Sequence, residues 1–252
     1  MRIGFDLDGT VADMQAALAR EAVLLFPGVD LASVPTSTAS ADGGESTDDS
    51  PDARLSTSGL SSGQMRQLWD AACAITNFWE TLDEIEPGAL ARLYAVANRR
   101  RWEVIFITSR PESAGDTAQM QSYRWLASHG FDTPSIFVAH GSRGKISAAL
   151  ALDVFVDDRP ENCLDIAIDS QARAILVWRG DEDKVPGSAR QLGIGSVTSI
   201  HQCLDILERT EDEKNEPGTT VVSRLKSLLG LKPRTPKRET PPRSTAAGMT
   251  RA

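Results

Sequence analysis

Two aspartates, Asp6 and Asp8, lie two residues apart directly after the short apolar run of residues 2–5, and Gly9 follows them. Side chains two apart on a strand point to one face, so both carboxylates would project over the strand's C-terminal end, where open α/β sheets bind ligands. Neighbouring carboxylates repel each other. They are tolerated together if a divalent cation neutralises them, or if they divide nucleophilic and acid–base work. The alternative is an Asx-type turn, in which both only accept hydrogen bonds from backbone amides.

Further polar groups follow later apolar runs. Thr108-Ser109-Arg110 ends one run, Lys145 opens a helical pattern, and Asp157-Asp158 ends another run. These groups would meet Asp6 and Asp8 if the first strand lies between the strands that end at 108 and 157. Such a set suits phosphoryl transfer, since Mg²⁺ takes oxygen ligands, an aspartate can accept a phosphoryl group, and the transferring oxygens need fixed donors and positive charge.

Strand-like and helical patterns alternate along most of the chain. The strand-like runs are rich in β-branched and aromatic residues and are almost continuously apolar, as in strands covered on both faces. This alternation predicts an α/β fold with a doubly wound parallel sheet. The expected strands are 2–7, 103–108, 135–139, 153–157, 173–178 and a weak one at 196–198, and the expected helices are 87–100, 114–129, 143–151, 160–170 and 199–209.

The interval between the first two strands is too long for one crossover, so residues 12–86 must hold an insertion. We expect helices at about 12–26 and 64–77, joined by a disordered Ser/Asp-rich loop at about 36–63. Residues 1–11 and 87–210 then form the core. The Pro-, Thr- and Arg-rich tail, 211–252, is expected to be mostly disordered, with a possible short amphipathic helix at 221–231 for contact with a protein or a membrane surface.

Composition narrows the class of protein. The chain of 252 residues is 40% hydrophobic, enough for a sizeable core, and has a formal net charge of −8. From Pro217 onward Lys and Arg prevail, so the rest is strongly acidic, which argues against binding a nucleic acid polymer. Three well-separated cysteines predict reduced thiols, and no apolar run reaches the ~18 residues of a membrane span. A cytoplasmic location is expected.

Four of these features together resemble the haloacid dehalogenase (HAD) superfamily of phosphohydrolases. Asp6-Leu7-Asp8-Gly9-Thr10 is similar to its first motif, Thr108 to its second, Lys145 to its third and Asp157-Asp158 to its fourth, across about residues 2–178. The resemblance implies a Rossmann-like core with a small helical cap of the C1 type, here residues 12–86, inserted after the first strand. It also implies a Mg²⁺ cofactor and a small phosphate ester as substrate.

The resemblance also implies residue roles. Asp6 would be the nucleophile and a metal ligand, and Asp8 the acid–base residue, with its carbonyl on the metal. Asp158 would be the main further ligand, supported by Asp157. Thr108, Ser109 and Lys145 would hold phosphoryl oxygens, with Arg143 as the competitor of Lys145. Arg110 would be either a phosphate contact or a solvated loop cation.

A nearer resemblance is to the 5′(3′)-deoxyribonucleotidase branch, through Asn77-Phe78-Trp79-Glu80, Glu86-Pro87-Gly88-Ala89, Tyr123-Arg124-Trp125 and Asp157-Asp158-Arg159-Pro160. Arg110 departs from it, because the branch tends to carry Pro there, and so does the loop at 36–63. Phe78 and Trp79 would stack on a nucleobase or pack in the cap. Glu84 and Glu86 are expected to be solvated.

The resulting hypothesis is a Mg²⁺-dependent phosphomonoester hydrolase that forms an aspartyl-phosphate and acts on nucleoside 5′-monophosphates. Two alternatives stay open: a phosphatase for another small ester such as a sugar phosphate, and a catalytically weak interaction protein with this fold. The oligomeric state is left open.

Overall fold

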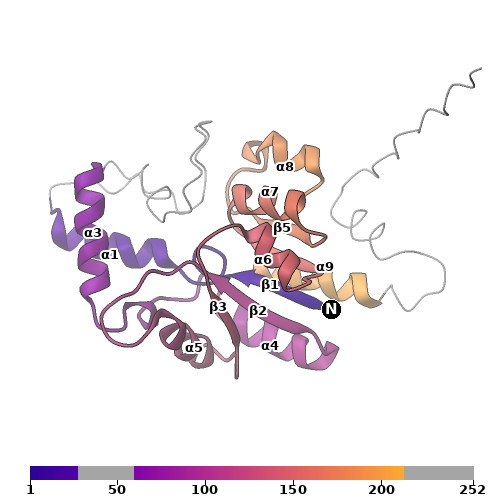
Figure 1. Ribbon diagram of the computed structural model, residues 1–252, viewed down its shortest axis with the longest axis horizontal. Coiled ribbons are helices and arrows are strands. Elements are labelled where there is room, and N and C mark those ends of the chain that lie inside the picture. The colour runs from indigo at the N-terminus through magenta and orange to yellow at the C-terminus, as the bar shows by residue number, and fades with distance from the viewer. Residues whose placement is uncertain (28–59, 213–252) are drawn as a thin grey trace, which may run out of the picture.

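A six-stranded, all-parallel sheet forms the centre of the molecule in the computed structural model, which describes residues 1–27 and 60–212 (Figure 1). The strands are β1 (Arg2–Asp6), β2 (Glu103–Thr108), β3 (Ser135–Val138), β4 (Val154–Asp157), β5 (Arg173–Val177) and β6 (Gly195–Val197). Their spatial order is β3-β2-β1-β4-β5-β6. This confirms the predicted doubly wound parallel sheet and places β1 between β2 and β4.

Helices cover both faces of the sheet. Because strand side chains alternate between faces, Ile3 and Phe5 face one apolar cluster, which includes residues of α4 (Ala89–Arg100), α5 (Ala118–Ser128) and α9 (Ile200–Asp212). The second cluster packs against α6 (Arg143–Ala149), α7 (Pro160–Asp169) and α8 (Gly187–Leu192). Gly4 faces this second cluster, where a Cβ atom would lie 2.5 Å from the ring of Phe155. The close contact of β1 with β4 therefore requires glycine.

Most element boundaries agree with the sequence prediction to within a few residues, and β2 agrees at both ends. The patterns did not predict α8 or the short 3₁₀ helices η2 (Phe78–Glu80) and η3 (Glu182–Lys184). With six residues or fewer, these elements are too short to show a helical period. α9 continues to Asp212, two residues into the segment predicted as tail.

The insertion contributes α1 (Met14–Leu25) and α3 (Ser62–Ala74), which pack against each other at one end of the sheet (Figure 1). Its two connections to the core run side by side, because the backbone amide of Asp13 donates to Asp83 and that of Ile85 donates to Val11. The predicted loop ends earlier than residue 63, since Leu60 is buried and Ser61 caps α3. The rest of that loop and the segment 221–231 lie outside the described residues.

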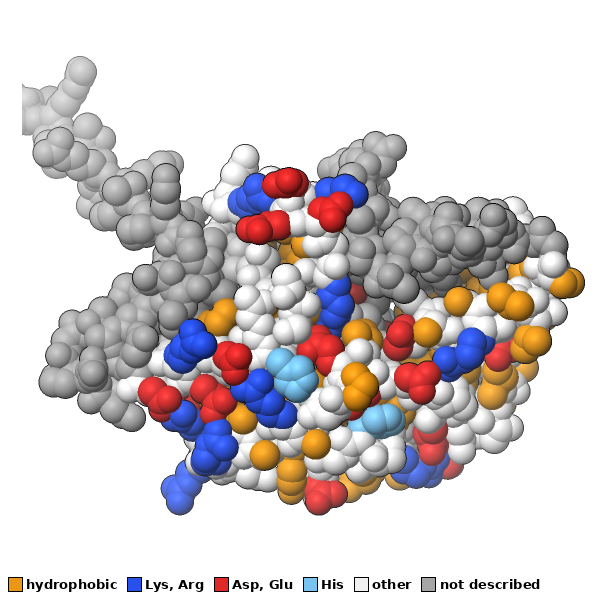
Figure 2. Space-filling view, turned by 180° about the vertical axis from the view of Figure 1, so that it is seen from behind, with side chains coloured by type: hydrophobic (Ala, Val, Ile, Leu, Met, Phe, Trp, Pro, Cys, Tyr) orange, Lys and Arg blue, Asp and Glu red, His pale blue; other side chains and the backbone are white. Residues whose placement is uncertain are grey.

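Charged groups of both signs are interspersed over the surface, as Figure 2 shows for one face. Several form ion pairs between α4 and α9, where Arg92 contacts Asp205 and Arg100 contacts Asp212. No helix within 1–27 and 60–212 is long and apolar enough to cross a membrane. All three cysteines are free thiols, as predicted.

Candidate active site

Three buried aspartates meet at the C-terminal edge of the sheet. Asp6 ends β1, Asp157 ends β4, and Asp158 follows it. Each offers a carboxylate oxygen within 4.8 Å of the others, and none is more than 4% exposed. They converge because β1 and β4 are adjacent and parallel, with Phe5 paired to Val156.

Neighbouring groups fix the orientation of these carboxylates. Asp157 accepts hydrogen bonds from the backbone amide of Arg159 at 2.8 Å and from the side-chain amide of Asn162 at 3.0 Å. Asp158 accepts one from the Thr10 hydroxyl at 3.1 Å. Thr10 lies just beyond the turn at Gly9, whose φ of 90° favours glycine. Groups that hold ligand carboxylates in place in this way are typical of metal centres.

This donor set fits a hard divalent cation. Three carboxylates supply oxygen ligands of the kind that Mg²⁺ prefers, and their combined negative charge is concentrated in a buried site. This charge also acts on the neighbouring thiol of Cys163. Burial raises the pKa of that thiol well above its usual value, and the charges of Asp157 and Asp158 raise it further. Asp6, Asp157 and Asp158 could therefore hold Mg²⁺.

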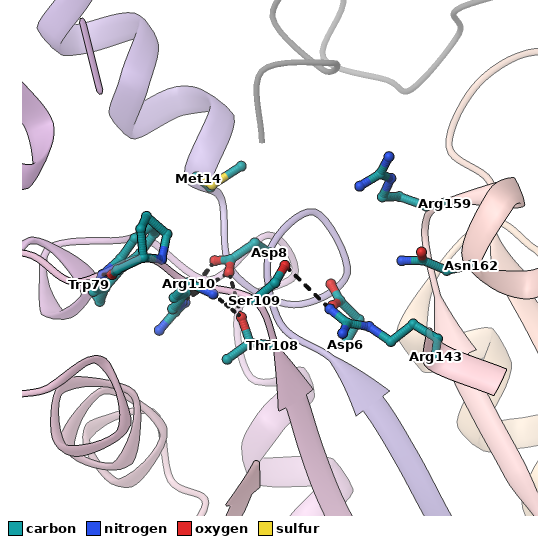
Figure 3. A pocket seen from close by; sticks show the side chains of 11 residues that line it. Asp6, Asp8, Met14, Trp79, Thr108, Ser109, Arg110, Arg143, Arg159 and Asn162 are labelled. Atoms are coloured by element: carbon teal, nitrogen blue, oxygen red, sulfur yellow. Dashed lines mark hydrogen bonds and ion pairs between the residues drawn. The ribbon is translucent and has the colours of Figure 1, made fainter. Parts of the chain in front are cut away.

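Asp8 is directed away from this group, toward β2. Its carboxylate accepts a hydrogen bond from the Thr108 hydroxyl at 3.1 Å and forms an ion pair with Arg110, whose Nη2 lies 2.8 Å from Oδ1 (Figure 3). Arg110 is only 3% exposed, so it is not a solvated loop cation. The structure also places its charge against Asp8, which the sequence analysis did not predict.

The basic residue beside Asp6 is Arg143. Its Nη2 lies 3.6 Å from Oδ1 of Asp6 and 3.4 Å from the Ser109 hydroxyl, and the side chain is almost fully buried. Lys145 is exposed and does not line the pocket. The reason is helical geometry: residues two apart on a helix point in nearly opposite directions, so α6 can direct only one of the two toward Asp6.

Close packing between helices sets the position of α6. A Cβ atom at Gly144 would lie 2.3 Å from the carbonyl oxygen of Asp165 in α7. Asp165 also accepts hydrogen bonds from the Gly144 amide and from the hydroxyl of Ser142, the N-cap of α6. These contacts fix the start of the helix, and with it the direction of Arg143.

The two aromatic residues expected near the substrate are fully enclosed. Phe78 is 1% exposed and Trp79 is 0% exposed, and their rings meet edge to face at 5.0 Å. Trp79 reaches the pocket, but the guanidinium of Arg110 lies over its ring, 4.9 Å from the centroid. The indole nitrogen donates to the carbonyl of Pro111 at 3.0 Å. This arrangement favours the packing alternative over stacking on a base.

These groups surround one small pocket. Its cavity volume is about 30 Å³, and it is lined by Asp6, Asp8, Met14, Trp79, Thr108, Ser109, Arg110, Pro111, Arg143, Arg159 and Asn162 (Figure 3). A cavity of about 10–15 Å³ holds one water, so this volume suits a few water-sized groups. The pocket has walls from both parts of the chain, since α1 of the insertion contributes Met14 and the core contributes Arg159 and Asn162.

The sequence analysis missed a contact that holds the loop after Asp8. Arg179, just beyond β5, donates to the carbonyl oxygens of Gly9 at 2.8 Å and Thr10 at 2.9 Å. The same guanidinium pairs with Glu86 at 2.6 Å, and Glu86 accepts hydrogen bonds from the Ile200 amide at the start of α9. The prediction that Glu86 is solvated was therefore wrong. Glu84 also departs from that prediction, since its carboxylate accepts a hydrogen bond from the backbone amide of Leu90 at 2.6 Å.

Comparison with known proteins finds solved structures of low sequence identity. No family model matches the chain, and no curated protein matches it. The solved structures that it resembles include a candidate β-phosphoglucomutase from Thermotoga maritima, which is 12% identical over 82% of this chain and 98% of that one, with a TM-score of 0.48. A hydrolase from Pseudomonas syringae is 17% identical over 84% and 99%, with a TM-score of 0.45.

A haloacid dehalogenase-like protein from Streptococcus pneumoniae is 13% identical over 82% of this chain and 97% of that one, with a TM-score of 0.46. At these identities and scores, no residue role or activity follows from the neighbours. The functional hypothesis therefore depends on the residues and geometry of this chain.

Proposed function

We propose that the protein is a Mg²⁺-dependent phosphomonoester hydrolase of the HAD type, in which Asp6 accepts the phosphoryl group. One observation carries the proposal: Asp6, Asp157 and Asp158 form a buried carboxylate group, and Asp6 lines a pocket that Arg143 and Asp8 also line. A set of acids alone would suit a simple cation site. The added guanidinium and second acid supply the positive charge and the proton transfer that phosphoryl transfer needs.

In this mechanism a carboxylate oxygen of Asp6 attacks the phosphorus atom, and the bond to the leaving oxygen breaks. Asp8 in its protonated form donates a proton to that oxygen. As the carboxylate, which Arg110 contacts on both oxygens, it then takes a proton from the water that hydrolyses the aspartyl-phosphate. Arg143 and Ser109 bind the phosphoryl oxygens, and Thr108 binds them once its hydroxyl hydrogen, which is donated to Asp8 in this structure, turns toward the substrate. Mg²⁺, held by Asp6, Asp157 and Asp158, would supply further positive charge at those oxygens when bound.

The insertion acts as the cap in this proposal. Its residues Met14 and Trp79 line the pocket, so it bounds the space into which the leaving group extends. Nucleoside 5′-monophosphates are the first substrate class to test, on the strength of the sequence resemblance. A sugar phosphate is the second, because Trp79 is covered by Arg110 and offers no open face to a base.

Phosphate release from a panel of phosphorylated metabolites, with and without Mg²⁺, tests this function. We expect hydrolysis of p-nitrophenyl phosphate and of at least one nucleoside 5′-monophosphate, and Asp6→Asn serves as the inactive control. Brisk release from a sugar phosphate, with none from any nucleotide, would contradict the substrate class and leave the reaction type intact. No release from any ester by the Mg²⁺-loaded protein would refute the reaction type.

A further inference from the structure

Arg110 is a cation enclosed in the protein interior beside the proposed acid–base residue. It is 3% exposed, and all three of its guanidinium nitrogens are engaged. Nε lies 3.1 Å from Oδ1 and 3.0 Å from Oδ2 of Asp8, and Nη2 lies 2.8 Å from Oδ1. The remaining nitrogen, Nη1, donates to the Ser122 hydroxyl at 2.9 Å. Asp8 thus receives a forked contact on both of its oxygens.

Two tryptophans hold the guanidinium in place. Its central carbon lies 4.9 Å from the ring centroid of Trp79 and 5.7 Å from that of Trp125. Both rings are themselves fixed, because the indole nitrogen of Trp79 donates to Pro111 and that of Trp125 donates to Leu82 at 2.8 Å. Trp79 belongs to the insertion and Trp125 to α5 of the core, so the contact joins the two parts of the chain at Asp8.

We infer that Arg110 is the positioning residue of Asp8, held by Trp79 and Trp125, and that it does not bind the phosphoryl group. The inference rests on the proposed function, in which Asp8 carries the proton. The two buried arginines then have different roles. Arg143 lies against Asp6, where phosphorus is attacked, and Arg110 lies against Asp8. A planar guanidinium can fix both oxygens of a carboxylate, which a single point charge cannot do.

A double-mutant cycle on Arg110 and Asp8 tests this role. The assay measures kcat on p-nitrophenyl phosphate and, separately, inhibition by inorganic phosphate, which reports binding of the phosphoryl group. We expect Arg110→Gln to lower kcat by about 100-fold through misplacement of Asp8. Arg110→Gln should raise the inhibition constant of phosphate far less than it lowers kcat, because a nearby charge is lost but no binding contact is. The double variant Arg110→Gln/Asp8→Asn should be no slower than Asp8→Asn alone.

Several outcomes would overturn the inference. A phosphate inhibition constant that rises together with the loss of kcat would make Arg110 a phosphate ligand. Fully multiplicative losses in the double variant would mean that Arg110 acts independently of Asp8. A wild-type protein without phosphatase activity would refute the proposed function itself, and this inference with it. If the wild type is active and the two substitutions lower kcat by factors that multiply, the inference alone is refuted.

Arg110→Lys covers the case in which Arg110→Gln does not fold. It keeps a positive charge in the buried site but removes the fork, so we expect a reduced kcat and an unchanged phosphate inhibition constant. Trp125→Phe provides a second probe, because it weakens the support of the guanidinium without altering Asp8 or Arg110. Wild-type kcat in Arg110→Lys would show that charge alone suffices and would overturn the positioning role.

Discussion

Replacing Arg143 tests the assignment of the phosphate-binding cation, and Lys145 provides a matched control two residues away. Arg143 lies 3.6 Å from Asp6, whereas Lys145 is exposed and outside the pocket. We expect Arg143→Ala to lose most activity and Lys145→Ala to keep nearly all of it. The two changes remove the same formal charge from the same helix, so they differ mainly in place.

The expected size of the effect follows from distance and burial. Two unit charges about 4 Å apart interact by about 4 kcal/mol at an effective dielectric constant of about 20. A dianionic phosphoryl group bound at Asp6 would lie at a comparable distance from the guanidinium of Arg143, which is 3.6 Å from Asp6. Because water and Mg²⁺ recover part of the lost interaction, we expect kcat/KM to fall by roughly 10²- to 10³-fold, the usual range for loss of one preorganised donor.

Steady-state kinetics on p-nitrophenyl phosphate at saturating Mg²⁺ measures this loss, and thermal unfolding shows whether each variant is folded. Arg143→Lys should recover part of the activity, since it restores a charge but not the contact geometry. Equal losses in Arg143→Ala and Lys145→Ala would refute the reasoning. A severe loss in Lys145→Ala alone would restore the assignment that the sequence favoured and would mean that α6 turns during catalysis.

Three further predictions concern the nucleophile, the metal and the thiols. Asp6→Asn should lower turnover by several orders of magnitude while leaving the protein folded, because an amide cannot attack phosphorus; ordinary turnover would exclude Asp6 as nucleophile. Chelation should abolish phosphate release, Mg²⁺ should restore it, and Ca²⁺ should inhibit, because its looser and higher coordination would misplace Asp6; full activity in excess chelator would contradict this. Burial raises the pKa of Cys203 to about 12 and that of Cys163 well above its usual value, so neither should form a reactive thiolate at pH 8. A disulfide-exchange reagent should therefore label both only after unfolding, and rapid labelling of the native protein would show that these thiols are accessible.

The sequence predicted the sheet and its acidic edge for local reasons. Apolar runs of strand length marked five of the six strands clearly, and an acid directly after a parallel strand must lie at the sheet's C-terminal edge. Asp6, Asp157 and Asp158 could therefore be grouped before their distances were known. The meeting of these acids with Thr108 also needed β1 to lie between β2 and β4, which the order of the strands satisfies.

The roles of the basic residues could not be predicted in the same way, because they depend on contacts between distant segments. Whether α6 directs Arg143 or Lys145 toward Asp6 depends on where the helix begins, and packing of Gly144 against α7 decides that. The partner of Arg110 depends on rings contributed by η2 and α5, more than 40 positions apart in the chain. The spacing of residues in the sequence indicates which of them share a face of one helix or strand. It does not indicate contacts between distant segments.

The acids of residues 84–86 show the same principle and connect it with the proposed mechanism. Glu84 and Glu86 were predicted to be a solvated pair. Glu86 instead joins Arg179 to the start of α9, and Arg179 donates hydrogen bonds to the carbonyl oxygens that follow Asp8. Residues near 86 also form the return of the insertion, which pairs with Val11. A displacement of the insertion would therefore pull on the loop that directly follows Asp8, the proposed acid–base residue. Trp79 and Arg110 form a second connection, in which Trp79 packs on Arg110 and Arg110 pairs with Asp8. The insertion is therefore linked to the proposed acid–base residue through two separate sets of contacts. The motif that contains Asp6 and Asp8 predicts neither of them.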